Sequence, residues 1–331
     1  MKNILITGGA GYIGSHVVEA LIKRQFNVFI VDNLSTGYKR LINKKSKFFN
    51  LNVNNSLKIK NILLDNKIES VIHLAASLDV NESQKKPKKY YNNNVTGTIN
   101  LVKACMDTNV KNFIFSSTAA VYKDGIYKVN ENSSIKPKSV YGKTKFKAEE
   151  VIKKKLKNSS ISYGILRFFN VCGASQTINI GQIKSYDLLF KNLSAAIIKK
   201  KPSINIYGND YKTKDGTCIR DFIHVVDISD IHLKVLEKIK RTRKSLLLNC
   251  GYGEGRSVFE VVKAFEKYSN KEIKINYKPR RQADLSQIIS NNCKLKKILK
   301  WRAKNNNLAS MVKSSIKWER KLHERNWKNC K

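Results

Sequence analysis

A glycine-rich loop between an apolar run and a helical stretch is the feature of this 331-residue sequence that most constrains its fold. The apolar run, residues 4–7, predicts a short buried strand, and residues 13–24 predict a helix. The loop between them reads GGAGYIG over residues 8–14. Glycines at this spacing permit a sharp turn and let backbone N–H groups at a helix N-terminus approach a phosphate closely. The loop therefore indicates a dinucleotide site in a strand–loop–helix unit.

Apolar runs and helical stretches alternate through the first half of the chain. Strands are predicted at residues 4–7, 28–32, 48–53, 71–74, 113–117 and 161–168, and helices at 13–24, 91–106 and 141–157. This alternation predicts an α/β fold built on a doubly wound, Rossmann-type parallel sheet with right-handed crossovers.

The pattern becomes less regular after residue 172. Strands are predicted at residues 204–207 and 246–249, and helices at 188–200, 258–268 and 308–325. We expect two domains, with residues 1–172 holding the dinucleotide and residues 173–331 forming a smaller α/β lobe for the substrate. Some segments of the second part are expected to return to the first lobe.

The net charge of +39, from 64 Lys and Arg against 25 Asp and Glu, raises a nucleic-acid-binding hypothesis. The lysine runs, such as residues 153–155 and 199–201, fall at predicted helix ends and loops without interleaved aromatic residues. That distribution favours a solvated surface over a binding groove, and we expect no nucleic-acid partner.

Membrane and metal-binding signals are weak in this sequence. No apolar run approaches the roughly 20 residues that span a bilayer, and no signal-peptide pattern surrounds the first predicted strand. We therefore expect no membrane association and a cytoplasmic location. The six cysteines are scattered without C-x-x-C pairs or metal-ligand spacing, so we expect free thiols and no metal.

Asp32 ends the second predicted strand, close to the interval expected for the acidic residue of a dinucleotide site. A carboxylate there accepts hydrogen bonds from the adenosine ribose and repels the 2′-phosphate of NADP. No arginine directly follows it, since the next basic residues are Lys39 and Arg40. The sequence therefore favours NAD over NADP.

Tyr141 and Lys145 are spaced to lie on one face of a helix. A free tyrosine, with a pKa of about 10, is a poor base at neutral pH. We expect the positive charges of Lys145 and of a nicotinamide ring to lower the pKa of Tyr141. Thr118, at the end of a predicted sheet strand with Ser116 and Ser117, is placed to bridge a substrate oxygen and Tyr141.

Further blocks of sequence accompany these residues in a fixed order. They read TGGAGYIGSH (7–16), DNLSTG (32–37), FSSTAAVY (115–122), RFFN (167–170), YGNDY (207–211), DGTCIRDFIHV (215–225) and RRQAD (280–284). Through them the chain resembles the UDP-glucose 4-epimerases of the extended short-chain dehydrogenase/reductase family. The resemblance covers residues 1 to about 284 and weakens over the basic C-terminal segment.

The resemblance implies NAD as the cofactor, a UDP-sugar as the substrate, and Tyr141, Lys145 and Thr118 as the catalytic group, with Tyr141 as the base. The positions that match cofactor contacts are Gly8, Gly11, Tyr12, Ile13, Gly14, Asp32, Asn33, Ser35, Asn52, Val53, Leu74, Ala75, Asn94, Lys145 and Phe169. The positions that match substrate contacts are Thr118, Tyr141, Asn170, Asn192, Tyr207, Arg220, Arg281 and Asp284. Two arginines in this set could clamp a diphosphate through charge-assisted hydrogen bonds.

Three positions depart from the family pattern. Asn52 stands in place of an aspartate that contacts the adenine, Leu78 in place of a frequent lysine near the cofactor, and Phe222 in place of a tyrosine beside Arg220. None of them removes a catalytic group, so we expect effects on affinity rather than on reaction type.

The implied reaction is the interconversion of UDP-galactose and UDP-glucose through transient oxidation at C4, as in galactose metabolism. The related dehydratases and decarboxylases need an added acid after the strand-end threonine, whereas Thr118 is followed here by Ala119 and Ala120. A non-enzymatic NAD-sensing or nucleic-acid-binding protein is the alternative from another class.

Ile288 leaves UDP-N-acetylhexosamines and UDP-pentoses open as substrates. A homodimer is expected, with apolar faces near residues 101–106 and 151–156 as candidate contacts.

Overall fold

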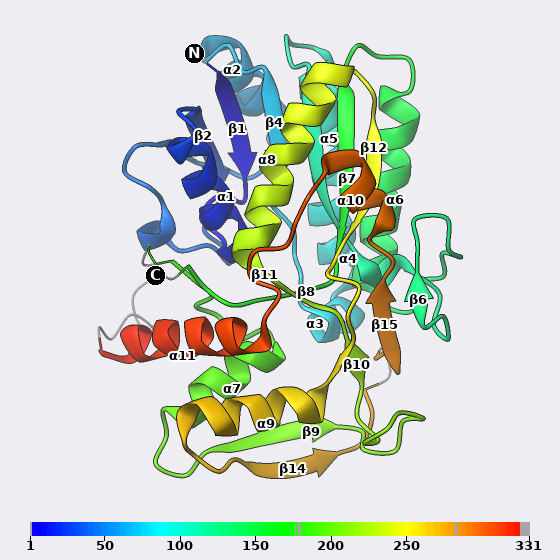
Figure 1. The fold of residues 1–331 in the computed structure, drawn as a ribbon. Helices are drawn as coiled ribbons and strands as arrows, with labels where there is room; N and C mark the ends of the chain where they lie inside the picture. Colours follow the sequence, from blue (N-terminus) through cyan, green and yellow to red (C-terminus); the bar gives the residue numbers. More distant parts are fainter. Residues whose placement is uncertain (1, 176, 178–179, 282–283, 325–331) are drawn as a thin grey trace.

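The computed structural model describes residues 2–175, 177, 180–281 and 284–324, and its larger lobe is built on a seven-stranded parallel sheet (Figure 1). The strand order is β12-β7-β5-β4-β1-β2-β3, and every neighbouring pair is parallel. The strands are β1 (Asn3–Thr7), β2 (Asn27–Asp32), β3 (Lys47–Asn50), β4 (Ser70–His73), β5 (Asn112–Thr118), β7 (Ser162–Phe168) and β12 (Leu246–Cys250). The predicted α/β fold with a doubly wound sheet is confirmed.

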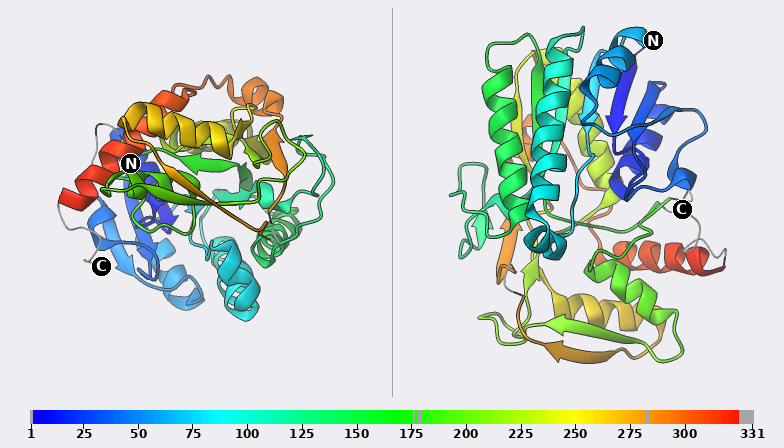
Figure 2. Two further views of the ribbon diagram at one scale, coloured as in Figure 1. Left: turned by 90° about the horizontal axis from the view of Figure 1, so that it is seen from below. Right: turned by 180° about the vertical axis from the view of Figure 1, so that it is seen from behind.

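Helices cover both faces of this sheet, which explains why its central strands are apolar along their whole length. On one face lie α1 (Tyr12–Lys23) and α8 (Val225–Thr242), whose apolar sides pack into one core cluster. On the other face, seen in the right-hand view of Figure 2, lie α2 (Ser56–Asp65), α5 (Gly97–Met106) and α6 (Val140–Leu156), which share a second cluster.

The smaller lobe packs three helices beside short strand pairs. The helices are α7 (Leu189–Ile197), α9 (Val258–Ser269) and α11 (Leu308–Glu324), and the strands β9 (Ser203–Tyr207) and β14 (Lys274–Lys278) pair in parallel (Figure 1). A four-stranded sheet runs β13 (Arg256–Ser257), β10 (Ile219–Arg220), β15 (Gln287–Ser290) and β6 (Lys128–Val129).

Shorter elements connect the two lobes or extend the helices of the larger one. Strands β8 (Asn170–Cys172) and β11 (Phe222–His224) pair in parallel, and α10 (Cys293–Leu299) packs beside β12. Helices α3 (Val80–Lys85) and α4 (Pro87–Tyr90) precede a π-helical stretch, Tyr91–Thr96, that runs directly into α5. The expected helix 91–106 is therefore continuous but begins in π-helical geometry.

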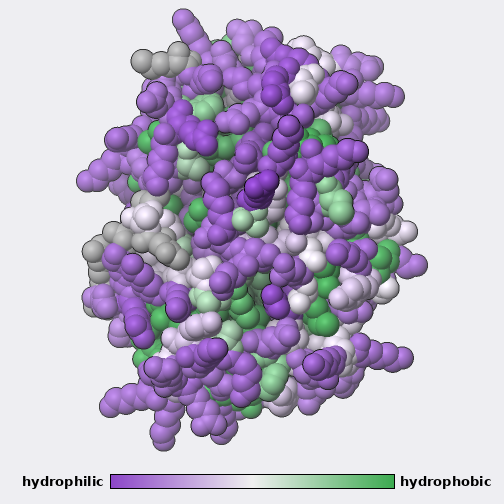
Figure 3. All heavy atoms as spheres, in the orientation of Figure 1, coloured by the Kyte–Doolittle hydropathy of each residue, from purple (hydrophilic) through white to green (hydrophobic). Residues whose placement is uncertain are grey.

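Two elements from the second half of the chain belong to the large sheet. Strand β12 pairs with β7 at its edge, and α8, a helix that the sequence pattern did not predict, packs against α1. Hydrophilic side chains cover most of the face shown in Figure 3, with small hydrophobic areas between them. Among the described residues, no helix combines the length and apolar character needed to cross a bilayer.

Candidate active site

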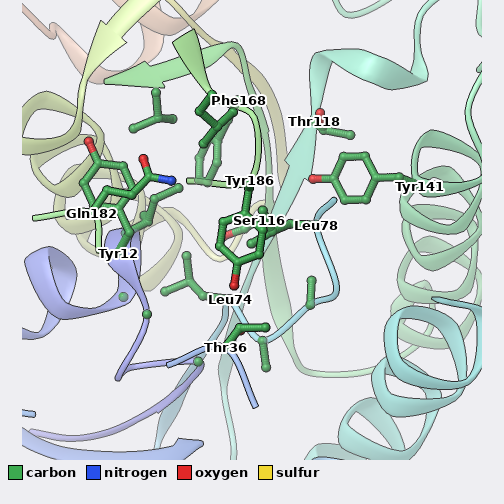
Figure 4. A pocket seen from close by; sticks show the side chains of 18 of the residues that line it. Tyr12, Thr36, Leu74, Leu78, Ser116, Thr118, Tyr141, Phe168, Gln182 and Tyr186 are labelled. Carbon is green, nitrogen blue, oxygen red and sulfur yellow. The ribbon is translucent and has the colours of Figure 1, made fainter. Parts of the chain in front are cut away.

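A cavity of about 420 Å³ opens where the parallel strands β1, β2, β4, β5 and β7 end, facing the smaller lobe. This is the switch point of a doubly wound sheet, where connections leave to opposite faces and ligands bind. The wall combines the glycine loop after β1, Asp32 at the end of β2, Leu74 after β4, and Thr118 at the end of β5. Figure 4 shows this cavity from close by.

The glycine loop is packed so tightly that a Cβ has no room at Gly8 or Gly14. Gly8 has a left-handed backbone with φ of 76°, and a Cβ on Gly14 would lie 2.1 Å from the Gly8 carbonyl oxygen. Helix α1 begins after Gly11, which offers no side-chain cap, so its first N–H groups are open toward the cavity. This cradle fits a pyrophosphate, whose charge the helix N-terminus also favours.

Asp32 faces the same loop with most of its surface buried. Its two carboxylate oxygens accept hydrogen bonds from the backbone N–H groups of Ala10 at 3.0 Å and Leu34 at 2.9 Å. Burial raises the pKa of Asp32, and these two bonds oppose that rise. Each oxygen keeps a lone pair, so the carboxylate can accept ribose hydroxyls as well. The loop and Asp32 together suit the adenosine and pyrophosphate of NAD.

The other predicted cofactor positions divide into two groups. All of them line the cavity except Asn94, which lies buried behind its wall. The Asn94 amide accepts from the N–H of Ser77 at 2.8 Å and donates to the Thr144 hydroxyl at 3.1 Å. Thr144 in turn donates to the carbonyl of Tyr141 at 2.8 Å. Asn94 therefore ties the segment after β4 to the start of α6.

A buried histidine continues this chain of hydrogen bonds. Because Thr98 donates to the Asn94 carbonyl at 2.6 Å, His73 must donate from Nε2 to Thr98, at 3.0 Å. Its Nδ1 then accepts from Thr7 at 2.7 Å. Burial, together with the charge of Lys145, lowers the pKa of His73 to about 3, so the imidazole is neutral. The direction of every bond from β1 to α6 is thereby fixed.

Tyr141 and Thr118 both line the cavity. Helix α6 begins with Ser139, whose hydroxyl accepts the N–H of Gly142 at 3.0 Å, and its first turn carries Tyr141. The Thr118 hydroxyl acts on that of Tyr141 as a hydrogen-bonding neighbour, and Figure 4 shows the two side chains on the same side of the cavity. Burial raises the pKa of Tyr141 to about 12, although the Thr118 bond lowers it in part. The expected lowering of this pKa is therefore not a property of the protein residues alone, because desolvation outweighs the hydrogen bond.

Lys145 lies one helical turn beyond Tyr141 and is also buried. Its ammonium sits 4.4 Å from the centre of the Phe115 ring. Desolvation lowers the pKa of Lys145 to about 7, and the nearby Glu149 carboxylate opposes that shift. A phenolate at Tyr141 would supply the counter-charge that this buried lysine needs.

Glu149 anchors the far end of the same helix face. It forms a buried, two-pronged ion pair with Arg167, at 2.9 Å and 2.7 Å, and accepts the Ser117 hydroxyl at 2.5 Å. Arg167 also donates to the Tyr122 hydroxyl at 2.9 Å. These contacts fix α6 against the ends of β5 and β7, the strands that carry Thr118 and the far wall of the cavity.

Acidic groups are scarce in the cavity. Among the described lining residues, the carboxylates are Asp32, at the adenosine end, and Asp284, which lies 3.9 Å from the Arg220 guanidinium. Ala119 and Ala120, after Thr118, form a short 3₁₀ turn in the wall. The neighbourhood of Thr118 therefore lacks an acid for elimination or decarboxylation chemistry.

The predicted substrate positions are only partly brought together. Thr118, Tyr141, Asn170, Arg220 and Asp284 line the cavity.

Asn192, Tyr207 and Arg281 lie outside the cavity lining. The Arg281 guanidinium stacks over the Tyr207 ring at 3.7 Å and pairs with Asp187 at 2.9 Å. Asn192 hydrogen-bonds Ser185 and Asp187.

Several lining residues were not named by sequence reasoning. The most prominent come from the segment before α7, which contributes Gln182, Ile183, Lys184, Tyr186 and Leu188. This segment has no regular periodicity, so no pattern marks it as part of a site. Within the described residues there is also no cluster of three side chains able to hold a metal ion.

Comparison with known proteins places this site in a family. Residues 4–251 match the profile described as NAD dependent epimerase/dehydratase family. The chain is 37% identical to a UDP-glucose 4-epimerase of Lactobacillus helveticus over 96% of its own length and 97% of the relative's.

Solved structures agree over nearly the whole chain. A Stenotrophomonas UDP-glucose 4-epimerase with bound NAD and formylated UDP-arabinopyranose superposes with a TM-score of 0.93 and 30% identity, covering 98% of this chain and 100% of the other. The UDP-Glc/GlcNAc 4-epimerase of Campylobacter jejuni gives 0.84 and 39% identity, covering 97% and 100%. The expected resemblance, the NAD cofactor and the assignment as an enzyme of the epimerase class are confirmed. The chain therefore belongs to the NAD-dependent epimerase/dehydratase family and, along almost its full length, resembles the UDP-glucose 4-epimerases.

Proposed function

We propose that the chain interconverts UDP-galactose and UDP-glucose by oxidising C4 of the hexose and reducing it again from the opposite face. The observation that carries this proposal is the Tyr141–Thr118 hydroxyl pair beside buried Lys145, with alanines rather than acids after Thr118 in the cavity wall. NAD supplies the group that accepts the hydride and gives it back, so no net redox change occurs.

Tyr141 acts as the base for the C4 hydroxyl. In the proposed first step its phenolate takes that proton while C4 loses a hydride, leaving a 4-keto sugar. The pKa of about 12 that Tyr141 has in the protein falls when positive charge gathers around the phenolate. Lys145 and the oxidised nicotinamide provide that charge, and Thr118 keeps the hydroxyl aimed at the reacting oxygen.

Inversion requires that the hexose turn while the nucleotide stays bound. Arg220 projects into the cavity beside Asp284, which suits a diphosphate and a neighbouring hydroxyl. Arg281 is proposed as the second arginine of this clamp and would have to leave Asp187 to reach a phosphate. A sugar held through its diphosphate alone can present either face of the keto group to the cofactor.

The assay that tests this function is conversion of UDP-galactose to UDP-glucose by the purified protein without added reductant. Turnover is expected, and Tyr141→Phe is expected to remove it while NAD remains bound. A need for stoichiometric NADH, or full activity in that variant, would overturn the proposal. Salt-sensitive binding of DNA or RNA with no turnover of UDP-galactose would support the nucleic-acid alternative instead.

Substrate breadth depends on Ile288, which is buried and lines the cavity on β15. Of the two superposed structures, the Campylobacter jejuni protein is named as a UDP-Glc/GlcNAc 4-epimerase, and the Stenotrophomonas protein has formylated UDP-arabinopyranose bound. We propose that UDP-glucose and UDP-galactose are preferred, and parallel assays with UDP-N-acetylglucosamine and UDP-arabinose test that preference.

We further propose a cytoplasmic homodimer with α5 and α6 in its contact. Leu101 and Leu156 are buried in the chain's own core, so the contact would use exposed residues of these two helices, of which Met106 is one. Size-exclusion chromatography with light scattering on the purified protein distinguishes a dimer from a monomer.

A further inference from the structure

Residues 180–188, between β8 and α7, run along the cavity and contribute five of its lining residues; we call this segment the strap. No periodicity predicts it, and the proposed chemistry uses none of its side chains. The strap belongs to the second half of the chain, yet it faces the loops that follow β1 and β2.

An apolar cluster fixes the start of the strap. Ile180 and Ile183 are buried together with Leu41, which follows β2, and with Trp318 and Leu322 of α11. The strap is therefore held against the nucleotide-binding lobe on one side and the C-terminal helix on the other. This contact gives α11 a position behind the cofactor cavity.

Asp187 fixes the other end through three different segments. Its carboxylate pairs with Arg281 at 2.9 Å, accepts from Asn81 of α3 at 3.5 Å and accepts from Asn192 of α7 at 3.3 Å. The backbone is left-handed at both Tyr186 and Asp187, with φ of 45° and 59°. Two successive non-glycine residues in this conformation are strained, and such strain persists where surrounding contacts hold it, often at ligand clamps.

Tyr186 lines the cavity from the middle of the strap. Figure 4 shows its hydroxyl directed toward Thr36, in the loop after β2. The hydroxyl is buried, and the Thr36 hydroxyl acts on it as a donor, but no acceptor for the phenol's own proton is found among the described residues. Burial raises the pKa of Tyr186 to about 12, although the Thr36 hydroxyl lowers it in part, so Tyr186 carries its proton at neutral pH and can donate it.

Lys184 adds a positive charge beside this phenol. Its ammonium lies 4.9 Å from the centre of the Tyr186 ring. Of the described residues that line the cavity, the lysines and arginines are Lys145, Lys184 and Arg220. Lys145 serves the reacting centre and Arg220 the substrate end, which leaves Lys184 as the cation on the strap.

We propose that the strap retains NAD, with the Tyr186 hydroxyl donating a hydrogen bond to an oxygen of the bound dinucleotide and the Ile183 cluster and Asp187 holding it in place. This inference rests on the NAD-dependent function. A buried phenol whose proton lacks an acceptor is unfavourable in the protein alone, and an acceptor on the ligand removes that penalty. Retention also suits a cofactor that returns to its starting state in every turnover.

The test compares Tyr186→Phe with the wild type by the rate of NADH release, followed by fluorescence, and by the Tm of the protein with and without NAD. Tyr277→Phe, which alters an exposed tyrosine on β14, is the matched control. We expect Tyr186→Phe to release NADH about three- to tenfold faster, as loss of one hydrogen bond would produce. Its Tm should fall clearly when NAD is bound and change less without it.

Equal losses of Tm with and without NAD would mean that the hydroxyl has only a structural role, and an unchanged release rate would also overturn the proposal. Ile183→Ala, which loosens the strap at its other anchor, should speed release as well. None of these measurements uses a sugar substrate. Faster NADH release from Tyr186→Phe, together with a wild type that does not epimerise UDP-galactose, would therefore support the role of the strap and reject the proposed function. Unchanged release from Tyr186→Phe, together with an active wild type, would support the function and reject the role of the strap.

Discussion

The carboxylate of Asp187 lies 2.9 Å from the guanidinium of Arg281, the arginine that we propose as a diphosphate ligand. Under this proposal, an anion of the protein competes with the diphosphate for this cation. Both side chains are partly exposed, so the pair itself contributes little to stability.

Asp187→Asn is therefore expected to tighten binding of UDP about two- to fivefold, because an exposed pair of this kind is worth up to about 1 kcal/mol. Calorimetric titration with UDP at low and high salt measures the change. Asp210→Asn is the matched control, since Asp210 pairs with the adjacent Arg280 at 2.7 Å. Unchanged or weaker UDP binding in Asp187→Asn would show that Arg281 does not reach the diphosphate.

Loss of the Thr118 hydroxyl should slow the reaction and shift its pH dependence. The Thr118 hydrogen bond lowers the pKa of Tyr141, so Thr118→Ala raises that pKa further above about 12. The rising limb of kcat against pH should move to higher pH, with kcat near neutrality reduced roughly 100-fold. Thr118→Ser keeps a hydroxyl and should restore most of the rate. A uniform loss at every pH would argue against this role.

The Glu149–Arg167 pair should be essential to folding rather than to chemistry alone. Both side chains are almost completely buried, and Glu149→Gln leaves the Arg167 charge without its counter-ion. Breaking a buried pair in this way costs about 3–5 kcal/mol, measurable as the free energy of unfolding in urea. Glu150→Gln, one residue further along α6, changes an exposed side chain and should cost almost nothing. Similar effects of the two substitutions would contradict this account.

Buried histidines should make the protein sensitive to mild acid. Desolvation lowers the pKa of His73 to about 3, and of His16, His224 and His232 to about 4. The unfolded chain takes up protons near the ordinary value of 6.5, so below that pH it binds more protons than the folded protein. The free energy of unfolding should therefore fall as pH drops from about 6.5 toward 4.

Replacing one of these histidines tests the cause. His232→Leu removes a buried ring and should reduce the loss of Tm between pH 7 and pH 5, whereas His323→Leu, at an exposed position, should leave that loss unchanged. An equal acid sensitivity in the two variants would exclude the buried imidazole at position 232 as a source.

Strong periodic signals made the larger lobe predictable. The glycine loop, Asp32 and the Tyr141–Lys145 spacing depend on residues close together in sequence, and their geometry follows from one strand, turn or helix. Strand β12 was predicted as a strand, but its place at the sheet edge beside β7 depends on pairing over about 80 residues. Sequence spacing alone does not determine such long-range contacts.

The substrate side was less predictable for a similar reason. Arg281 forms an ion pair with Asp187, and Asn192 forms hydrogen bonds with Ser185 and Asp187, so neither residue lines the cavity. These contacts join segments that carry no periodic pattern. Helix α8 was missed although one of its sides is apolar, and its role became evident only in its packing on α1. The pKa of Tyr141 in the protein alone is raised by its burial, which the sequence does not show, whereas the expected lowering involves a bound nicotinamide and stays a prediction.

Conversion of UDP-galactose deuterated at C4 tests the central claim most directly. The purified protein, without added NADH, is expected to yield UDP-glucose that retains deuterium at C4, because the hydride that leaves the sugar returns to it. Proton NMR of the product measures the retained label. Replacement of the deuterium by hydrogen from the solvent, or product formation only with added NADH, would contradict the account.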